Sequence, residues 1–514
     1  MYLILTASKD TYITNKIINN AYRTTDANLG RAGTLDLFKL YDESVISGSS
    51  NPIELSRVLI KFELDTLHSL TGTTLDIRDT SFKCTLKMKD VLGTQAVPRN
   101  FSLIAYPLSQ SFDEGDGRDV KSFGDLDVAN FVTASYSGGI NYPWFVTGAN
   151  KVGLLGSDDI DVIGSGSLGS GVVQLGKTQI FDDGTEDLSI DVTQIVSATL
   201  VGLVPNHGYR LSFTSSEEID SKTRFVKRFG SRHSRNVYLR PTMHVVYDDT
   251  IQDNHANFLF DVSGSLFLNN YHRGVPSNIV SGTSLTPLSG EDSISLTLRT
   301  GSFSKTVQAS QFTGSTTDAG LPGLYLTSLA IPSADTTIVI ASSSIRDFAI
   351  KSGSLTFDEI WHSNDGTMGF YTGSITLTTP QRTAVSSISA LPVINVTNLN
   401  GTYRLSDTVK IRVFGLDTRN AQNTPAKLPI NIKSEIFDAV YYQVVDTDVG
   451  DIVIPFTKEG NATRCSTDLD GMFFNFSMSA LHPGRVYHFE FLVVDRGIEL
   501  LLPERSPAFR VDAS

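Results

Sequence analysis

The sequence comprises 514 residues, of which 40% are hydrophobic and 19% are charged, and its formal net charge at pH 7 is −13. The length favours about three domains. The acidic balance argues against nucleic acids and anionic membranes as partners, because both would repel the chain. No run of about 18 apolar residues occurs, so no membrane-spanning helix is expected. Only two cysteines occur, Cys84 and Cys465, and both are predicted to be buried free thiols rather than a disulfide framework.

Strands dominate the predicted elements, because hydrophobic and polar residues alternate with a period of two. From Val58 onward every second residue is apolar, with Lys61 and Glu63 on the opposite face, and Phe82–Met88 alternates in the same way. One short helix is predicted at Asp191–Val196, whose first residue can cap it. The fold class is therefore all-β, in tandem β-sandwich domains. Further predicted strands are Ile294–Arg299, Thr336–Ile340, Ser374–Leu377, Val409–Phe414, Val440–Val445 and His488–Val494.

Two polar segments divide these strands into three groups. The first is Tyr247–Asn254, which follows a strand, and the second runs from Thr379 through a Ser-rich link to about Pro392. We therefore predict a first domain at 1–249, a middle β-sandwich at 250–388 and a last domain at 389–514.

Short motifs follow one another in a defined order through the first 250 residues. They are Asp10–Ile13, Asn28–Gly30, Arg57–Leu64, Trp144 before Thr147–Ala149, Leu188–Thr193 with Asn206–Leu211, and Ser231–Arg235 with Leu239–Tyr247. In this order they resemble the DNRLRE-type domain, a β-jelly-roll module related to carbohydrate-binding modules. The resemblance implies a jelly roll at 1–249. The chain departs from the family pattern at Phe112–Gly115, where the family often has a Trp before an acidic turn.

Basic residues without any acidic neighbour fill the segment between Ser221 and Tyr247. One interpretation is a patch for an anion or an acidic partner, such as an acidic face of a neighbouring subunit. The other is structural, with arginines that tie loops to backbone carbonyls and carboxylates inside the sandwich. The basic residues are Lys222, Arg224, Lys227, Arg228, Arg232, Arg235 and Arg240.

The sequence contains no common catalytic or metal-binding motif. His-Glu-x-x-His, Cys-x-x-Cys and Gly-x-Ser-x-Gly are absent, so no catalytic residue, metal ligand or cofactor is predicted. Gly164–Gly169 matches Gly-x-Gly-x-x-Gly, but no helix follows to hold a pyrophosphate, and a flexible loop is predicted there. Acidic clusters at Asp113–Asp119, Asp158–Asp161 and Asp446–Asp451 are predicted as solvated turns, with calcium ligands or paired catalytic carboxylates as alternatives.

The middle and last domains give mainly structural signals. Trp361 is predicted to be a core aromatic beside a hairpin turn at Asn364–Gly366. Leu481–Tyr487 resembles the Leu-x-Pro-Gly-x-x-Tyr step of fibronectin type III and other Ig-like sandwiches, in which the Tyr hydroxyl bonds back to the backbone. An Ig-like last domain is therefore expected, and such modules are mostly spacers and docking surfaces.

A strand-like segment directly follows Met1, and no basic n-region, apolar core or cleavage site precedes it, so no export signal is predicted. Together with the sandwich architecture, this resembles virion structural proteins of large tailed bacteriophages, which are made in the host cytoplasm and released by lysis. The resemblance implies a non-enzymatic component of the tail, baseplate or neck, located in the virion. Its partners would be other virion proteins in a symmetric, multi-copy assembly.

Two alternatives remain open at this point. A glycan-binding adhesion protein, of a phage or on a bacterial surface, would use exposed aromatic residues of the first domain, with Tyr136, Tyr142 and Trp144 as candidates and core packing as their other interpretation. A glycan depolymerase would need a pair of clustered Asp side chains.

Overall fold

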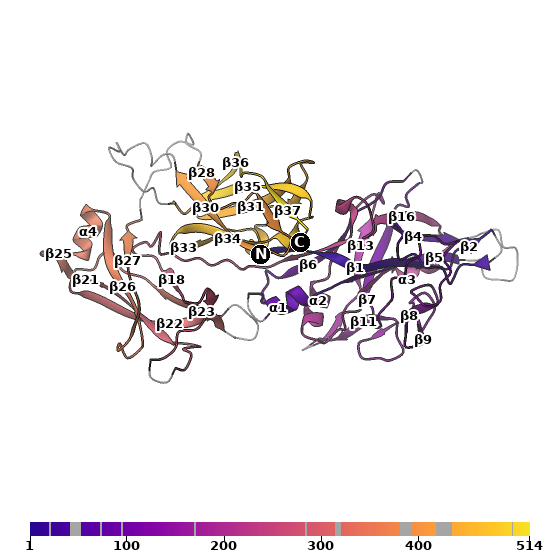
Figure 1. Ribbon diagram of the computed structural model, residues 1–514, viewed down its shortest axis with the longest axis horizontal. Coiled ribbons are helices and arrows are strands. Elements are labelled where there is room, and N and C mark those ends of the chain that lie inside the picture. Colours follow the sequence, from indigo (N-terminus) through magenta and orange to yellow (C-terminus); the bar gives the residue numbers. More distant parts are fainter. Residues whose placement is uncertain are drawn as a thin grey trace. The chain divides into compact units, whose positions relative to one another are not determined.

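The computed structural model describes residues 1–19, 22–41, 53–71, 74–93, 96–168, 171–282, 285–313, 320–380, 392–417, 434–495 and 497–513. Strands dominate these residues, and the helices among them are short, so the predicted all-β fold of tandem sandwiches is confirmed (Figure 1). Within the described residues, no helix has the length and apolar character needed to cross a lipid bilayer. Most of the predicted Ser-rich link, residues 381–391, lies outside the described residues.

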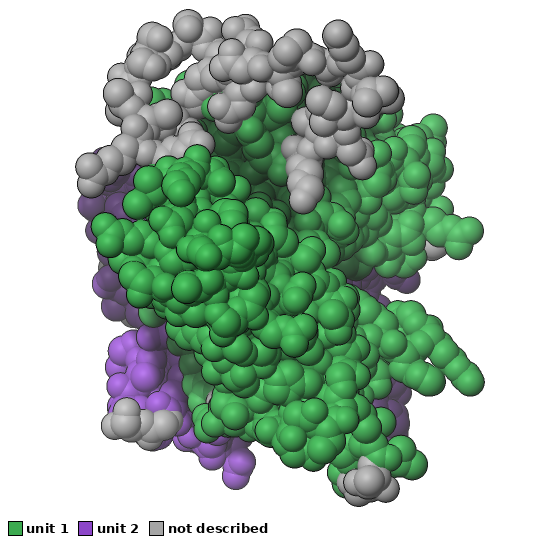
Figure 2. All heavy atoms as spheres, turned by 90° about the vertical axis from the view of Figure 1, so that its left-hand side faces the viewer, with its two compact units in different colours: residues 1–2, 70–81, 247–514 green, residues 3–69, 82–246 purple. Residues whose placement is uncertain are grey.

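The described chain divides into two compact units, coloured separately in Figure 2. Unit 2 contains residues 3–69 and 82–246, and unit 1 contains residues 1–2, 70–81 and 247–514. The predicted division between 250–388 and 389–514 falls inside unit 1 and stays a prediction.

Unit 2 is a β-sandwich, and its more specific assignment as a jelly roll stays a prediction. Its strands run in the order β13-β7-β15-β5-β1-β17-β6-β14, and β16 and β4 join this path at β5. Its strands are β1 (Tyr2–Thr14), β2 (Ile17–Ile18), β3 (Tyr22–Arg23), β4 (Thr34–Tyr41), β5 (Ile53–Phe62), β6 (Lys83–Met88), β7 (Phe101–Pro107), β8 (Thr133–Ser137), β9 (Ile140–Pro143), β10 (Val152–Leu154), β11 (Val162–Ser167), β12 (Val172–Gln174), β13 (Lys177–Phe181), β14 (Leu188–Asp191), β15 (Tyr209–Phe213), β16 (Arg224–Gly230) and β17 (Thr242–Val246). Its helices are α1 (Asp65–Leu70), α2 (Thr193–Leu200), α3 (Ser215–Ile219) and the 3₁₀ turn η1 (Val237–Leu239).

Strand β5 is buried on both faces, and this positions the loops described below. The predicted apolar face, which includes Val58, Ile60 and Phe62, is buried as expected. Leu59 on the opposite face is also fully buried, because it packs in a cluster with Phe112, Trp144 and other residues of the long loops. The loops between β7 and β13 therefore cover this face of the sheet instead of leaving it to water.

The middle part of unit 1 is a six-stranded antiparallel sheet in the order β18-β23-β22-β21-β26-β27. Trp361 is fully buried in its core, as predicted, and the Asn364–Gly366 turn joins β26 to β27. The elements here are β18 (Gly264–Asn269), β19 (Tyr271–His272), β20 (Val275–Pro276), β21 (Ile294–Thr300), β22 (Phe303–Thr313), β23 (Gly320–Leu329), β24 (Ile338–Ile340), β25 (Ser343–Ser344), α4 (Ile345–Lys351), β26 (Ser354–His362) and β27 (Gly369–Thr378).

The last part of unit 1 is an Ig-like sandwich of two sheets, β28-β30-β34-β33 and β29-β37-β35-β31-β32, with β36 paired to β35. In its core the ring of Tyr442 stacks on that of Phe474, and Phe489 contacts Phe474 edge to face. The predicted corner is confirmed, because the Tyr487 hydroxyl donates to the His482 carbonyl oxygen at 3.0 Å. The elements here are β28 (Pro392–Val396), β29 (Thr402–Arg404), β30 (Thr408–Asp417), β31 (Ala439–Asp446), β32 (Ile452–Ile454), η2 (Glu459–Asn461), β33 (Ser466–Asp468), β34 (Gly471–Ser477), η3 (Met478–Ala480), β35 (Arg485–Asp495), β36 (Ile498–Arg505) and β37 (Phe509–Asp512).

Two local predictions differ from the structure. Residues Val162–Ser167 form strand β11, so the described part of the Gly164–Gly169 motif is not a flexible loop; its backbone pairs with β10 and β12. The helix predicted at Asp191–Val196 begins later, at Thr193, and ends at Leu200. Asp191 still accepts a hydrogen bond from the Thr193 backbone N–H, at 2.8 Å.

Candidate functional site

The basic segment after Ser221 does not form one continuous charged surface. Most of its cations turn inward from β16 and the following loop, and only Lys222 and Arg235 of the six predicted patch residues are exposed. The four others form ion pairs within unit 2, which are Arg224 with Asp220 at 2.7 Å, Lys227 with Asp90 at 2.5 Å, Arg228 with Asp36 at 2.7 Å and Arg232 with Glu114 at 2.5 Å. These four side chains therefore tie loops together inside the sandwich and do not form a patch for a partner.

Lys227 is the extreme case, because its side chain is fully buried. Its Nζ donates to Asp90 and to the carbonyl oxygens of Gly184 and Glu186, at 2.5, 2.9 and 2.7 Å. Burial lowers the pKa of Lys227, while the hydrogen bond and attraction to Asp90 oppose this change. A charge with every donor satisfied in this way ties loops together and is not available to a partner.

A second buried network holds the loop at 145–150, which follows Trp144 and contains the Gly148–Ala149 part of the predicted Trp–Gly-Ala step. Arg57 donates to both oxygens of Glu218, at 2.9 and 2.7 Å, and to the Gly148 carbonyl oxygen at 2.6 Å. Arg210 donates to the carbonyl oxygen of Ala149 at 2.7 Å. Burial lowers the pKa of Arg210 to about 10. The arginine-containing strand motif thus anchors this loop.

The three candidate glycan contacts do not form one aromatic platform. Trp144 is only 3% exposed, packs in the core and donates from Nε1 to the Asn130 carbonyl oxygen, so it is removed from the candidate surface. Tyr136 and Tyr142 are 42% and 46% exposed on the β8–β9 hairpin. Tyr136 pairs with Asn141, and Tyr142 pairs with Ser135. Directly paired residues share a face, whereas neighbours alternate, so the two tyrosines lie on opposite faces of the hairpin.

The acidic clusters supply caps for loops and turns. Asp161, which is fully buried, accepts hydrogen bonds from the backbone N–H groups of Phe145, Val146 and Lys151, at 2.6, 3.0 and 2.9 Å. Asp446 is also fully buried and accepts from the backbone N–H of Asp448 at 2.9 Å. The prediction that these clusters are solvated turns is therefore wrong for these two residues, which are buried because they satisfy backbone donors.

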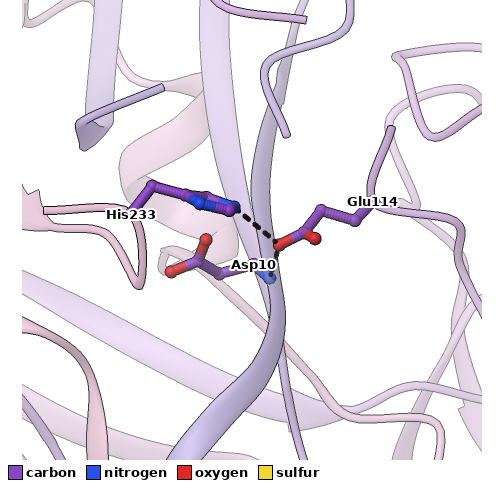
Figure 3. Close-up of side chains that lie close together, drawn as sticks. All are labelled: Asp10, Glu114 and His233. Carbon is purple, nitrogen blue, oxygen red and sulfur yellow. Dashed lines mark hydrogen bonds and ion pairs between the residues drawn. The ribbon is translucent and has the colours of Figure 1, made fainter. Parts of the chain in front are cut away.

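One group of side chains combines two carboxylates and an imidazole (Figure 3). Asp10 comes from β1, Glu114 from the loop after β7 and His233 from the loop after β16. Their potential ligand atoms all lie within 4.8 Å of one another. The Nε2 of His233 is directed at Glu114 and lies 3.6 Å from its Oε1. Sequence reasoning missed this group because its members are more than 100 residues apart along the chain.

Arg232 occupies the coordination sites that a metal would need. Its Nε and Nη2 donate to Glu114 Oε1 and Oε2, at 2.6 and 2.5 Å. Glu114 Oε1 also accepts from the backbone N–H of Asp10 at 2.8 Å. A divalent cation would have to displace the guanidinium and lie beside its charge, so the group does not fit a metal centre.

The titration of the group follows from its burial. Asp10 is 1% exposed, and its Oδ1 has no hydrogen-bond partner among the described residues. Burial, with repulsion from Glu114, raises the pKa of Asp10 to about 7, although a hydrogen bond from the Arg232 backbone opposes the rise. Burial and the charge of Arg232 lower the pKa of His233. Asp10 therefore titrates near neutral pH, and the lowered pKa of His233 favours its neutral imidazole.

His233 also lines a pocket of about 510 Å³ together with Arg31, Arg118 and Arg235. Of the residues predicted for a basic patch, Arg235 belongs to this pocket, whereas Arg31 and Arg118 lie far away in sequence and were not predicted. A cavity lined by guanidinium groups can bind an anion.

Comparisons with known proteins do not assign the chain to a family. No protein-family model matches it, and no curated protein matches it. Among solved structures, it is similar to the Ig1–2 module of the Drosophila receptor protein tyrosine phosphatase DLAR, with 12% identity, coverage of 49% of this chain and 90% of that chain, and a TM-score of 0.13. It is also similar to the FN1–FN3 domains of chicken CNTN1, with 9% identity, coverage of 60% of this chain and 80% of that chain, and a TM-score of 0.14. The match to latent PorU from Porphyromonas gingivalis has 9% identity, covers 100% of this chain and 34% of that chain, and has a TM-score of 0.16.

TM-scores in this range do not establish a shared fold. The Ig-like character of the last part of unit 1 rests on its own two sheets and on the corner formed by Tyr487.

Proposed function

We propose that this chain is a non-enzymatic structural component of a tailed-bacteriophage virion, in the tail, baseplate or neck. The observation that supports this proposal best is that buried charged side chains hold the loops of the sandwich in place. In tandem β-sandwiches, Lys227, Arg57 and Asp161 tie loops to the sheets through buried contacts. Cross-linked loops of this kind suit a rigid building block that transmits load between neighbours.

Exposed apolar side chains provide surfaces for assembly contacts. On and after the β8–β9 hairpin, Ile140 is 59%, Phe145 54% and Val146 37% exposed, and on edge strand β12 Val172 is 73% exposed. Apolar groups on a strand that ends a sheet favour pairing with another chain. The proposed partners are therefore other virion proteins in a symmetric, multi-copy arrangement, and the proposed location is the particle.

The proposal is tested by mass spectrometry of purified phage particles together with cryo-electron microscopy of the intact particle. We expect the chain at a fixed copy number, with the β8–β9 hairpin or β12 buried against a neighbour. Absence of the chain from particles would contradict the proposal.

A glycan array on the purified chain separates the proposal from an adhesion function. Specific binding that Tyr142→Ala abolishes, and that Tyr371→Ala on exposed β27 leaves unchanged, would favour the glycan-binding alternative. If the chain is also missing from particles, the alternative replaces the structural proposal.

A further inference from the structure

Three loops of unit 2 converge on the pocket lined by Arg31, Arg118, His233 and Arg235. Arg31 precedes β4, Arg118 lies in the loop between β7 and β8, and Arg235 follows β16. The loops therefore bring together cations separated by 87 and 117 positions, which is an arrangement that only the fold creates.

The buried Asn28 fixes two of these loops against each other. Its Nδ2 donates to the carbonyl oxygens of Glu114 and Ala129, both at 2.8 Å, and its Oδ1 accepts from the Gly117 N–H at 2.7 Å. The contact needs glycine, because a Cβ on Gly30 would lie 2.0 Å from the Glu114 carbonyl oxygen. The backbones that carry Arg31 and Arg118 are thus held in place before any ligand binds.

The third loop is held in the same way. The buried Ser231 donates from its hydroxyl to the Ala32 carbonyl oxygen at 2.6 Å and accepts from the His233 N–H at 3.1 Å. The Arg232 N–H donates to Asp10 Oδ2 at 2.5 Å. Arg235 therefore extends from a loop whose base is fixed on the loop that carries Arg31.

Positive charge is in excess around the pocket. Arg31 pairs with Asp116 at 2.6 Å, but both side chains are largely exposed. No ion pair of Arg118 or Arg235 occurs within the part of the chain that the structure describes. Glu114 is neutralised by the two hydrogen bonds from Arg232. On a chain of net charge −13, this is a local excess of guanidinium groups.

We propose that this pocket binds a tetrahedral oxyanion, a phosphate or sulfate group, held by Arg31, Arg118 and Arg235. Each guanidinium presents five N–H donors, and a tetrahedral dianion offers three or four acceptor oxygens in different directions. Guanidinium groups that approach from three loops match this shape, whereas a planar carboxylate is satisfied by one or two of them. The inference is independent of the proposed virion function.

The test is isothermal titration calorimetry of the full chain with inorganic phosphate and with inorganic sulfate, at low ionic strength. We expect saturable binding that weakens as salt is added, because screening reduces the attraction. Arg118→Gln and Arg235→Gln are each expected to weaken binding about tenfold, since each variant removes charged hydrogen-bond donors to the anion.

Lys222→Gln is the matched control, because Lys222 is an exposed cation of the same basic segment outside the pocket. It should leave the dissociation constant unchanged. Circular dichroism of each variant establishes that it is folded. If phosphate and sulfate do not bind, or if Arg118→Gln and Arg235→Gln bind them as the wild type does, the proposal is overturned.

Further titrants identify the source and the class of the ligand. A sulfated disaccharide is compared with free sulfate on the wild type and on Arg235→Gln. If the disaccharide binds the wild type more tightly than free sulfate does, and this difference disappears in Arg235→Gln, the proposal is supported and the ligand is an anion carried on a sugar. If free sulfate binds as tightly as the sulfated disaccharide, the proposal is supported and the ligand is a free ion. Equal affinity for glucuronate, or binding of zinc ions in place of phosphate, would overturn it.

Discussion

His255 is the side chain with the clearest electrostatic role in unit 1. Its Nδ1 lies 2.5 Å from Asp253 Oδ1, and its Nε2 lies 2.8 Å from Glu359 Oε1, with all three side chains buried. Burial by itself lowers the pKa of His255, but the hydrogen bonds to both carboxylates outweigh burial and raise it to about 9. The buried imidazolium thus joins the segment before β18 to strand β26.

Replacing His255 with Ala leaves Asp253 and Glu359 without their shared cation. We expect a loss of about 3–5 kcal/mol in the free energy of unfolding near pH 6. Because the folded pKa lies above the ordinary value of 6.5, the stabilisation is complete below pH 6.5 and is lost as the pH rises through 9. Chemical denaturation at pH 6 and pH 9.5 should therefore show a smaller difference between variant and wild type at the higher pH.

His272→Ala is the control, since His272 is exposed on β19. It should change the stability by less than about 0.5 kcal/mol at either pH. An equal loss for His255→Ala at both pH values would contradict the assigned protonation.

At the scale of elements, corners and loop anchors determine how the strands connect. In the last part of unit 1, the Tyr487 hydroxyl both donates to the carbonyl oxygen of His482 and accepts from its N–H, each at 3.0 Å. The hydroxyl thereby fixes the turn that leads into β35, the strand that pairs with β31, β36 and β37.

Tyr487→Phe removes these two hydrogen bonds without changing the packing of the ring. We expect a loss of about 1–3 kcal/mol, because a buried backbone group is deprived of its partner. Urea denaturation monitored by far-UV circular dichroism measures this change in the free energy of unfolding. Tyr371→Phe, at a hydroxyl on a ring that is 42% exposed, should have no measurable effect, and a similar loss in both variants would argue against the corner as the cause.

At the scale of the whole molecule, each compact unit has its own hydrophobic core. One core in unit 2 centres on Leu59 and Trp144, whereas the core around Trp361 and the aromatic core around Tyr442 both belong to unit 1. Separate cores favour separate cooperative transitions, because each core is packed by side chains of its own unit.

Differential scanning calorimetry should therefore resolve a transition of unit 2 that is separate from the unfolding of unit 1. Arg57→Met leaves Glu218 buried without its cation and should lower only the transition of unit 2, by an amount equivalent to about 3–5 kcal/mol. His255→Ala should lower only the transition of unit 1. A single transition, or a shift of both transitions by either variant, would show that the units unfold together.

Much of the fold could be predicted from local patterns in the sequence. Alternation from Val58 to Leu64 and from Phe82 to Met88 predicted buried strand faces, and the structure confirms both. The Leu481–Tyr487 motif predicted a corner that depends on residues only five positions apart. Such features are set within one strand or one turn, so the local pattern of residues is enough to predict them.

The site was decided by the tertiary structure. Whether Arg232 faces solvent or Glu114 depends on a partner 118 positions away, and the burial of Trp144 depends on the loops that cover β5. Likewise, Arg31, Arg118 and Arg235 become neighbours only when Asn28 and Ser231 join their loops. A charge or a ring looks alike in sequence whether it is buried or exposed, because burial is decided by chain segments that meet only on folding.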